Sequence, residues 1–379
     1  MAQLSPNAHL IGRPGSRAQL MTPALVIDLD ALEGNIARMA EHARRHGVGL
    51  RPHAKTHKSV TIARMQVTAG ALGACVATLG EAEVMVEGGV PGVLITTPVV
   101  TPAKIARLIA LHRRADGLMV VADHPGNVDD LASAAREGGG CLAVAAALDV
   151  GGHRIGAAGT DAALAVARCI DEVGSLTFAG IHAYAGPLQH IEDYGLRRRR
   201  AEDVGAMVGE LREKLDAAGI APPLVSGAGT GTHDIDALHG PFTELQVGSY
   251  IFTDVQYDAV VLREDMPRPF EPALFVRTTV VSTNVGGQAT TDGGLKRFAT
   301  DGPPPEIASG APDGARYEFK GDEHGRVVFA KDGDSLPLGA AIECLTPHCD
   351  PTVNLYDHYH VVRGDTLVDI WPVDGRGVI

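Results

Sequence analysis

The amino-acid sequence predicts an α/β protein that combines a TIM-like (β/α)8 barrel with a second, all-β domain. Between residues 23 and 265, short apolar segments alternate with longer amphipathic ones, giving about eight or nine strand–helix pairs. Apolar strands that alternate with helices are typical of a parallel sheet covered on both faces, and this number of repeats favours a closed barrel. From residue 266 to 379, strand-like segments separated by Gly and Asp turns predict the β-domain.

Each predicted barrel strand is a short apolar segment followed by a helical one. The first is ALVIDLD (24–30), and its helix (31–47) is expected to end at Gly47. The next strands are VGLRPHAK (48–55), GACVAT (73–78), GVLITT (92–97), GLMVVAD (117–123), CLAVAAALDV (141–150), TFAGIHAY (177–184), PLVSGAG (223–229) and ELQVGSYIF (244–252). The proline-rich connector REDMPRPFEPA (263–273) predicts the domain boundary, and residues 1–22 are expected to pack with the β-domain.

The composition restricts the partners and the location. A formal net charge of -13 argues against nucleic acid, which requires a basic surface, and the basic run 197–200 is interpreted as a solvated helix face. The five cysteines include no CxxC pair, so we expect neither a zinc ribbon nor a disulfide framework, and reduced thiols indicate the cytoplasm. The sequence shows no secretory signal, and no apolar run approaches the roughly 18 residues of a membrane span.

Reactive side chains are expected where barrel strands end. These positions carry Lys55, Thr78 with Glu81, Asp123, Asp149 with Arg154, Tyr184, the glycine-rich SGAGTGT (226–232) and GSY (248–250). Lys55 lies in RPHAKTHKS (51–59), next to His53, His57 and Lys58. Like charge and desolvation would lower the pKa of a lysine in this position and suit it to forming a Schiff base, whereas an ordinary surface lysine is the alternative.

The glycine-rich segment after the strand PLV could direct backbone amides at an anion, although such a segment can also be a simple turn. It matches neither a Walker loop nor a dinucleotide fingerprint. A phosphate cradle together with an acceptor lysine suggests pyridoxal 5′-phosphate as the cofactor.

The segment His348–Cys349–Asp350 suggests a metal site. On a strand, His348 and Asp350 would share one face and Cys349 would point away. An imidazole and a carboxylate without a thiolate suit Mn²⁺, Mg²⁺ or Co²⁺ better than structural zinc, and Mn²⁺ is the ion we expect. A hydrogen-bonded His–Asp pair is the other interpretation of this segment.

Nine motifs in the same order give the chain a specific resemblance: RPHAKTHKS, TLGEAE, DVGGHRIG, AYAGPLQH, SGAGTGT, ELQVGSY, TDGGLK, DEHG and PHCDPTVNLYD. The chain resembles the D-threonine aldolases, which join an alanine-racemase-like barrel to a C-terminal β-domain. D-serine dehydratases and hydroxyaspartate aldolases share most of these motifs.

The resemblance assigns roles to individual residues. Lys55 would bind the cofactor covalently, Arg154 would reach its ring near the phenolic oxygen, and Tyr184 would lie beside the ring. Thr230, Gly248 and Ser249 would hold the phosphate, and Tyr250 joins the cofactor-binding set. His190 would act near the substrate hydroxyl, and His348 and Asp350 would bind the divalent ion. Two positions depart from the family pattern, since Ala228 replaces a glycine of SGGGTGS and Ala185 replaces the histidine of AYHG.

The implied activity is the cleavage of D-threonine and related D-β-hydroxy-α-amino acids to glycine and an aldehyde, by a homodimer. A D-serine dehydratase is an alternative, but those enzymes carry a cysteine where this chain has Asp350. A 3-hydroxy-D-aspartate aldolase would act on the same reacting atoms. A racemase would need a partner for Lys55 such as Tyr356 or Tyr359, and a non-catalytic cofactor-binding protein is the remaining alternative.

Overall fold

The computed structural model describes residues 5–379, which form two compact units. The barrel unit contains residues 37–248, 260–269 and 377–379, and the β-unit contains the residues up to Ile36 together with 249–259 and 270–376. The sequence predicts a single boundary between residues 265 and 266. In the structure, both units instead contain segments from several parts of the chain.

Eight parallel strands form the sheet of the barrel unit. They are β2 (Gly49–Leu50), β3 (Cys75–Val76), β4 (Leu94–Ile95), β5 (Met119–Ala122), β6 (Leu142–Ala147), β7 (Leu176–Ala183), β8 (Val225–Gly227) and β9 (Glu244–Leu245). Their order is β2-β9-β8-β7-β6-β5-β4-β3, and a parallel bridge between His53 and Cys75 joins the two end strands. The predicted parallel barrel is confirmed.

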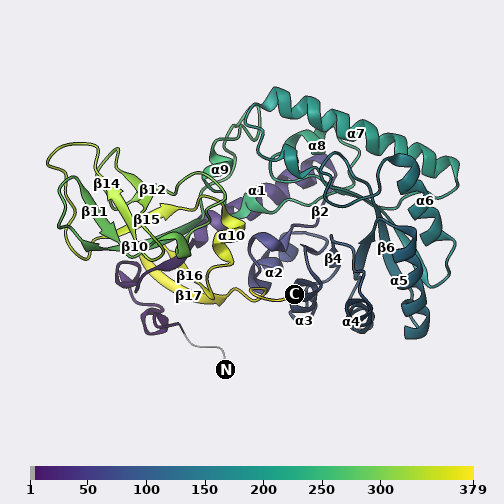
Figure 1. Ribbon diagram of the computed structural model, residues 1–379, viewed down its shortest axis with the longest axis horizontal. Coiled ribbons are helices and arrows are strands. Elements are labelled where there is room, and N and C mark those ends of the chain that lie inside the picture. The colour runs from purple at the N-terminus through teal and green to yellow at the C-terminus, as the bar shows by residue number, and fades with distance from the viewer. Residues whose placement is uncertain (1–4) are drawn as a thin grey trace. The chain divides into compact units, whose positions relative to one another are not determined.

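Helices follow the strands and cover the sheet, as Figure 1 shows for α5 and α6 beside β6. They are α2 (Val60–Thr68), α3 (Leu79–Glu87), α4 (Pro102–His112), α5 (Pro125–Gly138), α6 (Thr160–Asp171), α7 (Tyr194–Ala217) and α8 (His233–His239). The helix α1 (Leu29–His46) precedes β2, and its residues up to Ile36 belong to the β-unit. As predicted, α1 ends before Gly47, whose φ of 68° is left-handed. Thr78 and Glu81 form a capping box that fixes the start of α3.

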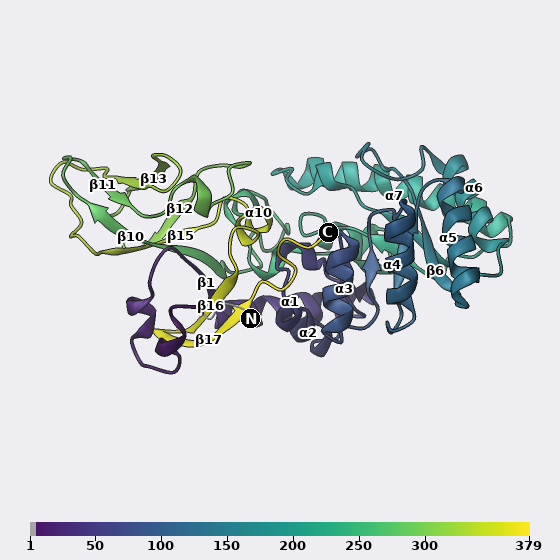
Figure 2. The ribbon, with the colours of Figure 1, turned by 60° about the horizontal axis from the view of Figure 1, so that its bottom comes forward.

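The β-unit holds the second sheet, in the order β13-β14-β11-β10-β1-β16-β17, with β15 pairing to β10 and β12 (Figure 2). The strands are β1 (Ala24–Asp28), β10 (Leu274–Ser282), β11 (Gln288–Thr291), β12 (Glu306–Ser309), β13 (Arg316–Phe319), β14 (Gly325–Val328), β15 (Ala341–Leu345), β16 (His358–Arg363) and β17 (Thr366–Pro372). Two short helices, α9 (Val255–Asp258) and α10 (Cys349–Val353), complete the unit.

The sequence predicts that segment 24–30 is the first barrel strand, and this prediction is wrong. Its strand β1 pairs antiparallel with β10 and parallel with β16 in the sheet of the β-unit. The first four residues of β1 are buried, so the segment is apolar on both faces. Such a run suits the centre of either sheet, which is why the sequence pattern did not distinguish them.

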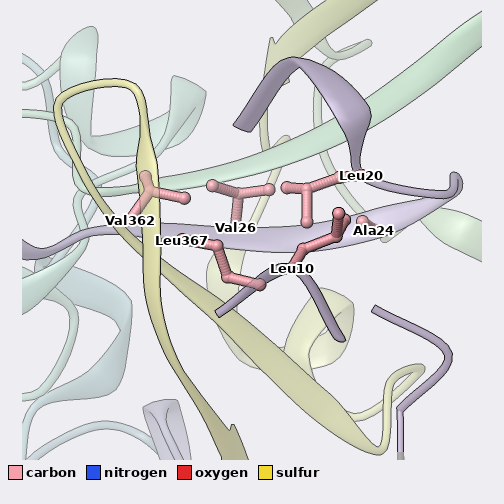
Figure 3. Packing of buried hydrophobic residues seen from close by; sticks show 6 residues of the cluster. All are labelled: Leu10, Leu20, Ala24, Val26, Val362 and Leu367. Carbon is pink, nitrogen blue, oxygen red and sulfur yellow. The ribbon is translucent and has the colours of Figure 1, made fainter. Parts of the chain in front are cut away.

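The N-terminal segment packs on this sheet (Figure 3). Leu10, Leu20 and Val26 form one apolar cluster with Val362 and Leu367, and all five side chains are buried. The cluster links the start of the chain to β16 and β17.

A buried ion pair connects β2 to β9 inside the barrel unit. Arg51, directly after β2, places Nε 2.9 Å from Oε1 of Glu244, and neither residue is more than 6% exposed. Ser226 donates a 2.6 Å hydrogen bond to the same carboxylate. Arg51 also donates to the carbonyl of Gly92. The charges are therefore paired and hydrogen-bonded, as buried charges must be.

Among residues 5–379, no helix combines the length and the apolar character that crossing a membrane would require.

Removal of one partner of the buried pair should destabilise the fold strongly. Arg51→Met should lower the free energy of unfolding by about 3–5 kcal/mol, because it leaves Glu244 buried without its counter-charge. Urea unfolding measures this. The matched control is Arg114→Met, which breaks an exposed 3.0 Å pair with Glu87 and should change stability by about 0.5 kcal/mol or less. Equal effects of the two substitutions would contradict the assignment.

Candidate active site

Lys55 lies in a single turn of 3-10 helix, η3 (Ala54–Thr56), that follows β2. The ring of His53 stabilises this turn. Its Nδ1 atom accepts a 3.3 Å hydrogen bond from the backbone amide of Lys55, and its Nε2 atom lies 3.2 Å from the hydroxyl of Thr96. The turn is thus tied to the loop after β4. Lys55 is half-buried and lines a cavity.

The cavity lies at the ends of the barrel strands and has a volume of about 300 Å³, at the lower end of the range for small-molecule sites. It is lined by Lys55, Leu148, Asp149, Gly152, Arg154, Ile155, His182, Tyr184, Gly186 and Pro187. The guanidinium carbon of Arg154 lies 5.8 Å from the centre of the Tyr184 ring. Three residues that the sequence predicts for one site are therefore brought together: Lys55, Arg154 and Tyr184.

The charges around Lys55 differ from the sequence-based expectation of a cationic cluster. Lys58 is bound to Glu81 at 2.7 Å, and Arg51 is bound to Glu244. Burial, followed by the charge of Lys55, lowers the pKa of His53 well below its ordinary value. His53 is therefore neutral near pH 7, and the two other cations have carboxylate partners.

His182, which the sequence analysis did not single out, forms part of the cavity wall. Burial lowers its pKa to about 4, so its ring is neutral. Within residues 5–379, its Nε2 atom is buried and has no hydrogen-bond partner. The signal that could have identified it is its place in β7, two residues before Tyr184.

The loop that carries Arg154 folds around the carboxylate of Asp149. One oxygen, Oδ1, accepts the backbone amides of Gly151, Gly152 and His153, each at 3.0 Å. Burial raises the pKa of Asp149, but the hydrogen bonds from His153 and Gly151 outweigh it and leave the pKa lowered. A charged Asp149 therefore fixes the backbone that precedes Arg154.

The glycine-rich segment owes its shape to Gln189. The buried Gln189 side chain accepts the amide of Gly231 at 2.9 Å and donates to Thr232 at 3.3 Å and to the carbonyl of Ala185 at 3.1 Å. A Cβ atom at Gly229 would lie 2.4 Å from the Gln189 side chain, and one at Gly231 would lie 2.1 Å from its carbonyl oxygen. Packing against the backbone therefore requires a glycine at 231, whatever the segment binds, whereas a side chain at 229 would displace the end of the Gln189 side chain.

The other predicted cofactor residues lie outside the cavity lining among residues 5–379. Thr230 is buried, and its carbonyl accepts a 2.7 Å hydrogen bond from His233. Gly248 lies against the turn of Lys55, since a Cβ there would be 2.6 Å from the Thr56 hydroxyl. Ser249 and Tyr250 belong to the β-unit, where Tyr250 packs edge-on against Phe270.

His190 is exposed and does not line this cavity either, within the part of the chain that the structure describes. The residues after it are anchored by Arg197, whose guanidinium donates to the carbonyls of Ile191 and Val261. Arg197 is fully buried. The interpretation of the run 197–200 as a solvated face is therefore wrong for its first residue.

The predicted metal residues lie in the β-unit, after β15, and their local structure differs from the prediction. His348 is extended, but Asp350 lies in the first turn of α10 rather than on a strand. The amide of Cys349 donates to Asp254 at 2.8 Å, which fixes the turn. Burial, followed by the charges of Asp254 and Asp350, raises the pKa of the Cys349 thiol well above its ordinary value.

The residues present suit both groups that the sequence suggests. The cavity offers an amine, a guanidinium, a phenol ring and the unpartnered nitrogen of His182, which together suit a polar aromatic cofactor. His348 and Asp350 offer nitrogen and oxygen donors. Among residues 5–379, no three His, Cys, Asp or Glu side chains form a group that could hold an ion. Two protein ligands would leave positions open for water and substrate, as a catalytic ion requires.

Family models cover most of the chain. The model of the alanine racemase N-terminal domain matches residues 27–255, and that of a serine dehydratase domain matches residues 273–362. In solved structures, the D-threonine aldolase from Filomicrobium marinum superimposes with a TM-score of 0.90 and 38% identity, covering 96% of this chain and 97% of that one. The D-threo-3-hydroxyaspartate dehydratase from Delftia sp. HT23 gives a TM-score of 0.83 and 28% identity, covering 94% and 98%.

Two curated relatives are equally similar to this chain. The 3-hydroxy-D-aspartate aldolase of Paracoccus denitrificans (strain Pd 1222) is 38% identical over 370 residues, which cover 96% of this chain and 94% of the relative. The D-threonine aldolase of Arthrobacter sp. is 38% identical over 364 residues, covering 95% and 94%. The protein is therefore a member of the alanine racemase N-terminal domain family, and within it a lyase homologous to the D-threonine and 3-hydroxy-D-aspartate aldolases.

Proposed function

We propose that the protein cleaves D-threonine and related D-β-hydroxy-α-amino acids between Cα and Cβ, releasing glycine and an aldehyde. The observation that favours cleavage over dehydration is the pair His348 and Asp350. A carboxylate occupies the position where the related dehydratases would carry a cysteine, and the side chain of the neighbouring Cys349 is buried.

Lys55, Arg154 and Tyr184 would hold pyridoxal 5′-phosphate in the cavity. When bound, this cofactor supplies an aldehyde for an amine and a ring that accepts electrons from a breaking Cα bond. Lys55 would provide the amine, and Arg154, held by the Asp149 loop, would contact the ring oxygen. Thr230, Gly248, Ser249 and Tyr250 would contribute to the phosphate end.

His348 and Asp350 would hold the divalent ion, for which we propose Mn²⁺, with Mg²⁺ or Co²⁺ as alternatives, because an imidazole and a carboxylate without a thiolate suit these ions better than structural zinc. Such an ion supplies Lewis acidity, which lowers the pKa of a nearby hydroxyl. His190 would receive the proton of the substrate β-hydroxyl, since histidine can accept a proton near neutral pH.

A 3-hydroxy-D-aspartate aldolase is the second candidate, because the relative with that activity is as similar as the D-threonine aldolase. Both reactions break the same bond, and the substrates differ only in a methyl or a carboxylate group. A racemase is less well supported. The hydroxyl of Tyr356 donates a hydrogen bond to the carbonyl of Arg297, and Tyr359 is fully buried, so neither side chain is presented as an acid or base partner for Lys55.

We further propose that the enzyme is a cytoplasmic homodimer acting on small molecules. The five cysteines are all free thiols in the structure, which suits a reducing compartment. Light scattering of the purified protein and fractionation of cells test the two parts separately.

Lys55 should carry the cofactor, because it is the lysine of RPHAKTHKS that lines the cavity. Borohydride reduction of the yellow holoenzyme, followed by peptide mass spectrometry, should locate the added mass on Lys55. Lys55→Ala should lose turnover and covalent attachment together. Lys58→Ala is the matched control and should keep the cofactor, since Lys58 is engaged with Glu81. Label on Lys58 instead would refute the assignment.

Chelation should abolish cleavage of D-threonine but leave the cofactor absorbance unchanged, because Lys55 and the metal pair lie in different units of the chain. Added Mn²⁺ should restore activity to the wild type and not to Asp350→Ala. Chromatography should identify glycine and acetaldehyde as products, with no reaction of L-threonine. Comparison with 3-hydroxy-D-aspartate at matched concentration decides between the two aldolase candidates.

The dehydratase makes the opposite product prediction. Ammonia and 2-oxobutanoate as the main products from D-threonine would refute the aldolase proposal, even if metal dependence and Lys55 attachment held.

A further inference from the structure

Asp301 lies directly behind the predicted metal ligand His348. Its Oδ2 atom is 2.8 Å from Nδ1 of His348, although the residues are 47 positions apart in the chain. Asp301 belongs to the connection between η6 (Leu295–Arg297) and β12. Nothing in the sequence motifs singles it out.

The connection is hydrogen-bonded to α10 before Asp301 and closely packed after it. Before Asp301, the backbone amide of Ala299 donates a 3.0 Å hydrogen bond to the buried hydroxyl of Thr352 in α10. The same hydroxyl donates a 2.8 Å hydrogen bond to the carbonyl of His348. After Asp301, Gly302 packs against Gln256 so closely that a Cβ would lie 2.6 Å from its side-chain nitrogen. The backbone around Asp301 and the backbone of His348 are therefore held by the same threonine.

A carboxylate bonded to one imidazole nitrogen decides how the other nitrogen can be used. When Nδ1 carries the proton and donates it to Asp301, Nε2 presents its lone pair, and an ion would bind His348 through that atom. The same hydrogen bond fixes the orientation of the ring. Without it, the ring could rotate or adopt the tautomer with a protonated Nε2.

We propose that Asp301 is a positioning residue of the metal site, which acts through His348 and does not touch the ion. This inference rests on the proposed function, because it requires His348 to be a metal ligand. The proposed metal site would then include a residue from the separate segment 299–302 in addition to His348 and Asp350.

The test is the affinity of the full-length, cofactor-loaded protein for Mn²⁺, measured by isothermal titration after chelation and dialysis. Asp301→Ala should weaken binding about 10–100-fold, the usual effect of losing such an outer partner. Asp301→Asn should stay within about fivefold of the wild type, since an amide oxygen can accept the same hydrogen bond. Asp332→Ala, which removes an exposed carboxylate elsewhere in the β-unit, is the matched control and should bind like the wild type.

Two further measurements separate the possible failures. The melting temperature without metal should be nearly unchanged in Asp301→Ala, because the side chain is 55% exposed. His348→Ala reports on the site itself: if it binds Mn²⁺ as the wild type does, or if the wild type binds none, the proposed metal site is wrong, and this inference falls with it.

With His348-dependent binding established, the remaining outcomes concern Asp301 alone. An affinity of Asp301→Ala equal to that of the Asp332→Ala control would overturn the inference. Equal weakening by Asp301→Asn and Asp301→Ala would also overturn it, because the contribution would then come from charge or direct ligation rather than from an orienting hydrogen bond.

Discussion

The buried ion pair between Arg51 and Glu244 is the constraint on which the site depends. Two charges inside a barrel are tolerated only when both are present and hydrogen-bonded, so this pair fixes the pairing of β2 with β9 at Gly49 and Glu244. A shift of register by one residue would separate the charges. Because β2 and β9 are locked in this way, the turn of Lys55 emerges beside Gly248, which follows β9.

A polar connection leads from the ion pair to the wall of the cavity. Ser226 donates to Glu244, the side-chain amide of Gln246 donates to Ser226 at 2.8 Å, and Gln246 in turn hydrogen-bonds to His182. All four side chains are buried, and Nε2 of His182 is the buried nitrogen that this network leaves for the cavity. These hydrogen bonds hold the neutral ring of His182 at the cavity. The sequence motifs in which the four residues occur do not reveal that their side chains contact one another.

The sequence predicts those parts of the fold and site that follow from local pattern. Eight apolar strands and the meeting of Lys55, Arg154 and Tyr184 at their ends required only the barrel rule. The sheet to which β1 belongs depends on long-range pairing with β10 and β16. The helical turn at Asp350 does have a local signal in the sequence, since Pro351 suits the first turn of a helix and not the centre of a sheet.

The shape of the glycine-rich segment depends on packing as well as on the flexibility of its glycines. Ala228 has a φ of 62°, a left-handed conformation that costs a residue with a Cβ roughly 1–2 kcal/mol. The segment adopts it nonetheless, so its shape at this residue is imposed by its surroundings, chiefly the hydrogen bonds of Gln189, rather than by glycine flexibility. An alanine is therefore tolerated at 228, whereas Gly229 and Gly231 would collide with Gln189 if either gained a side chain. This packing explains why a side chain is accommodated at position 228 and not at position 231.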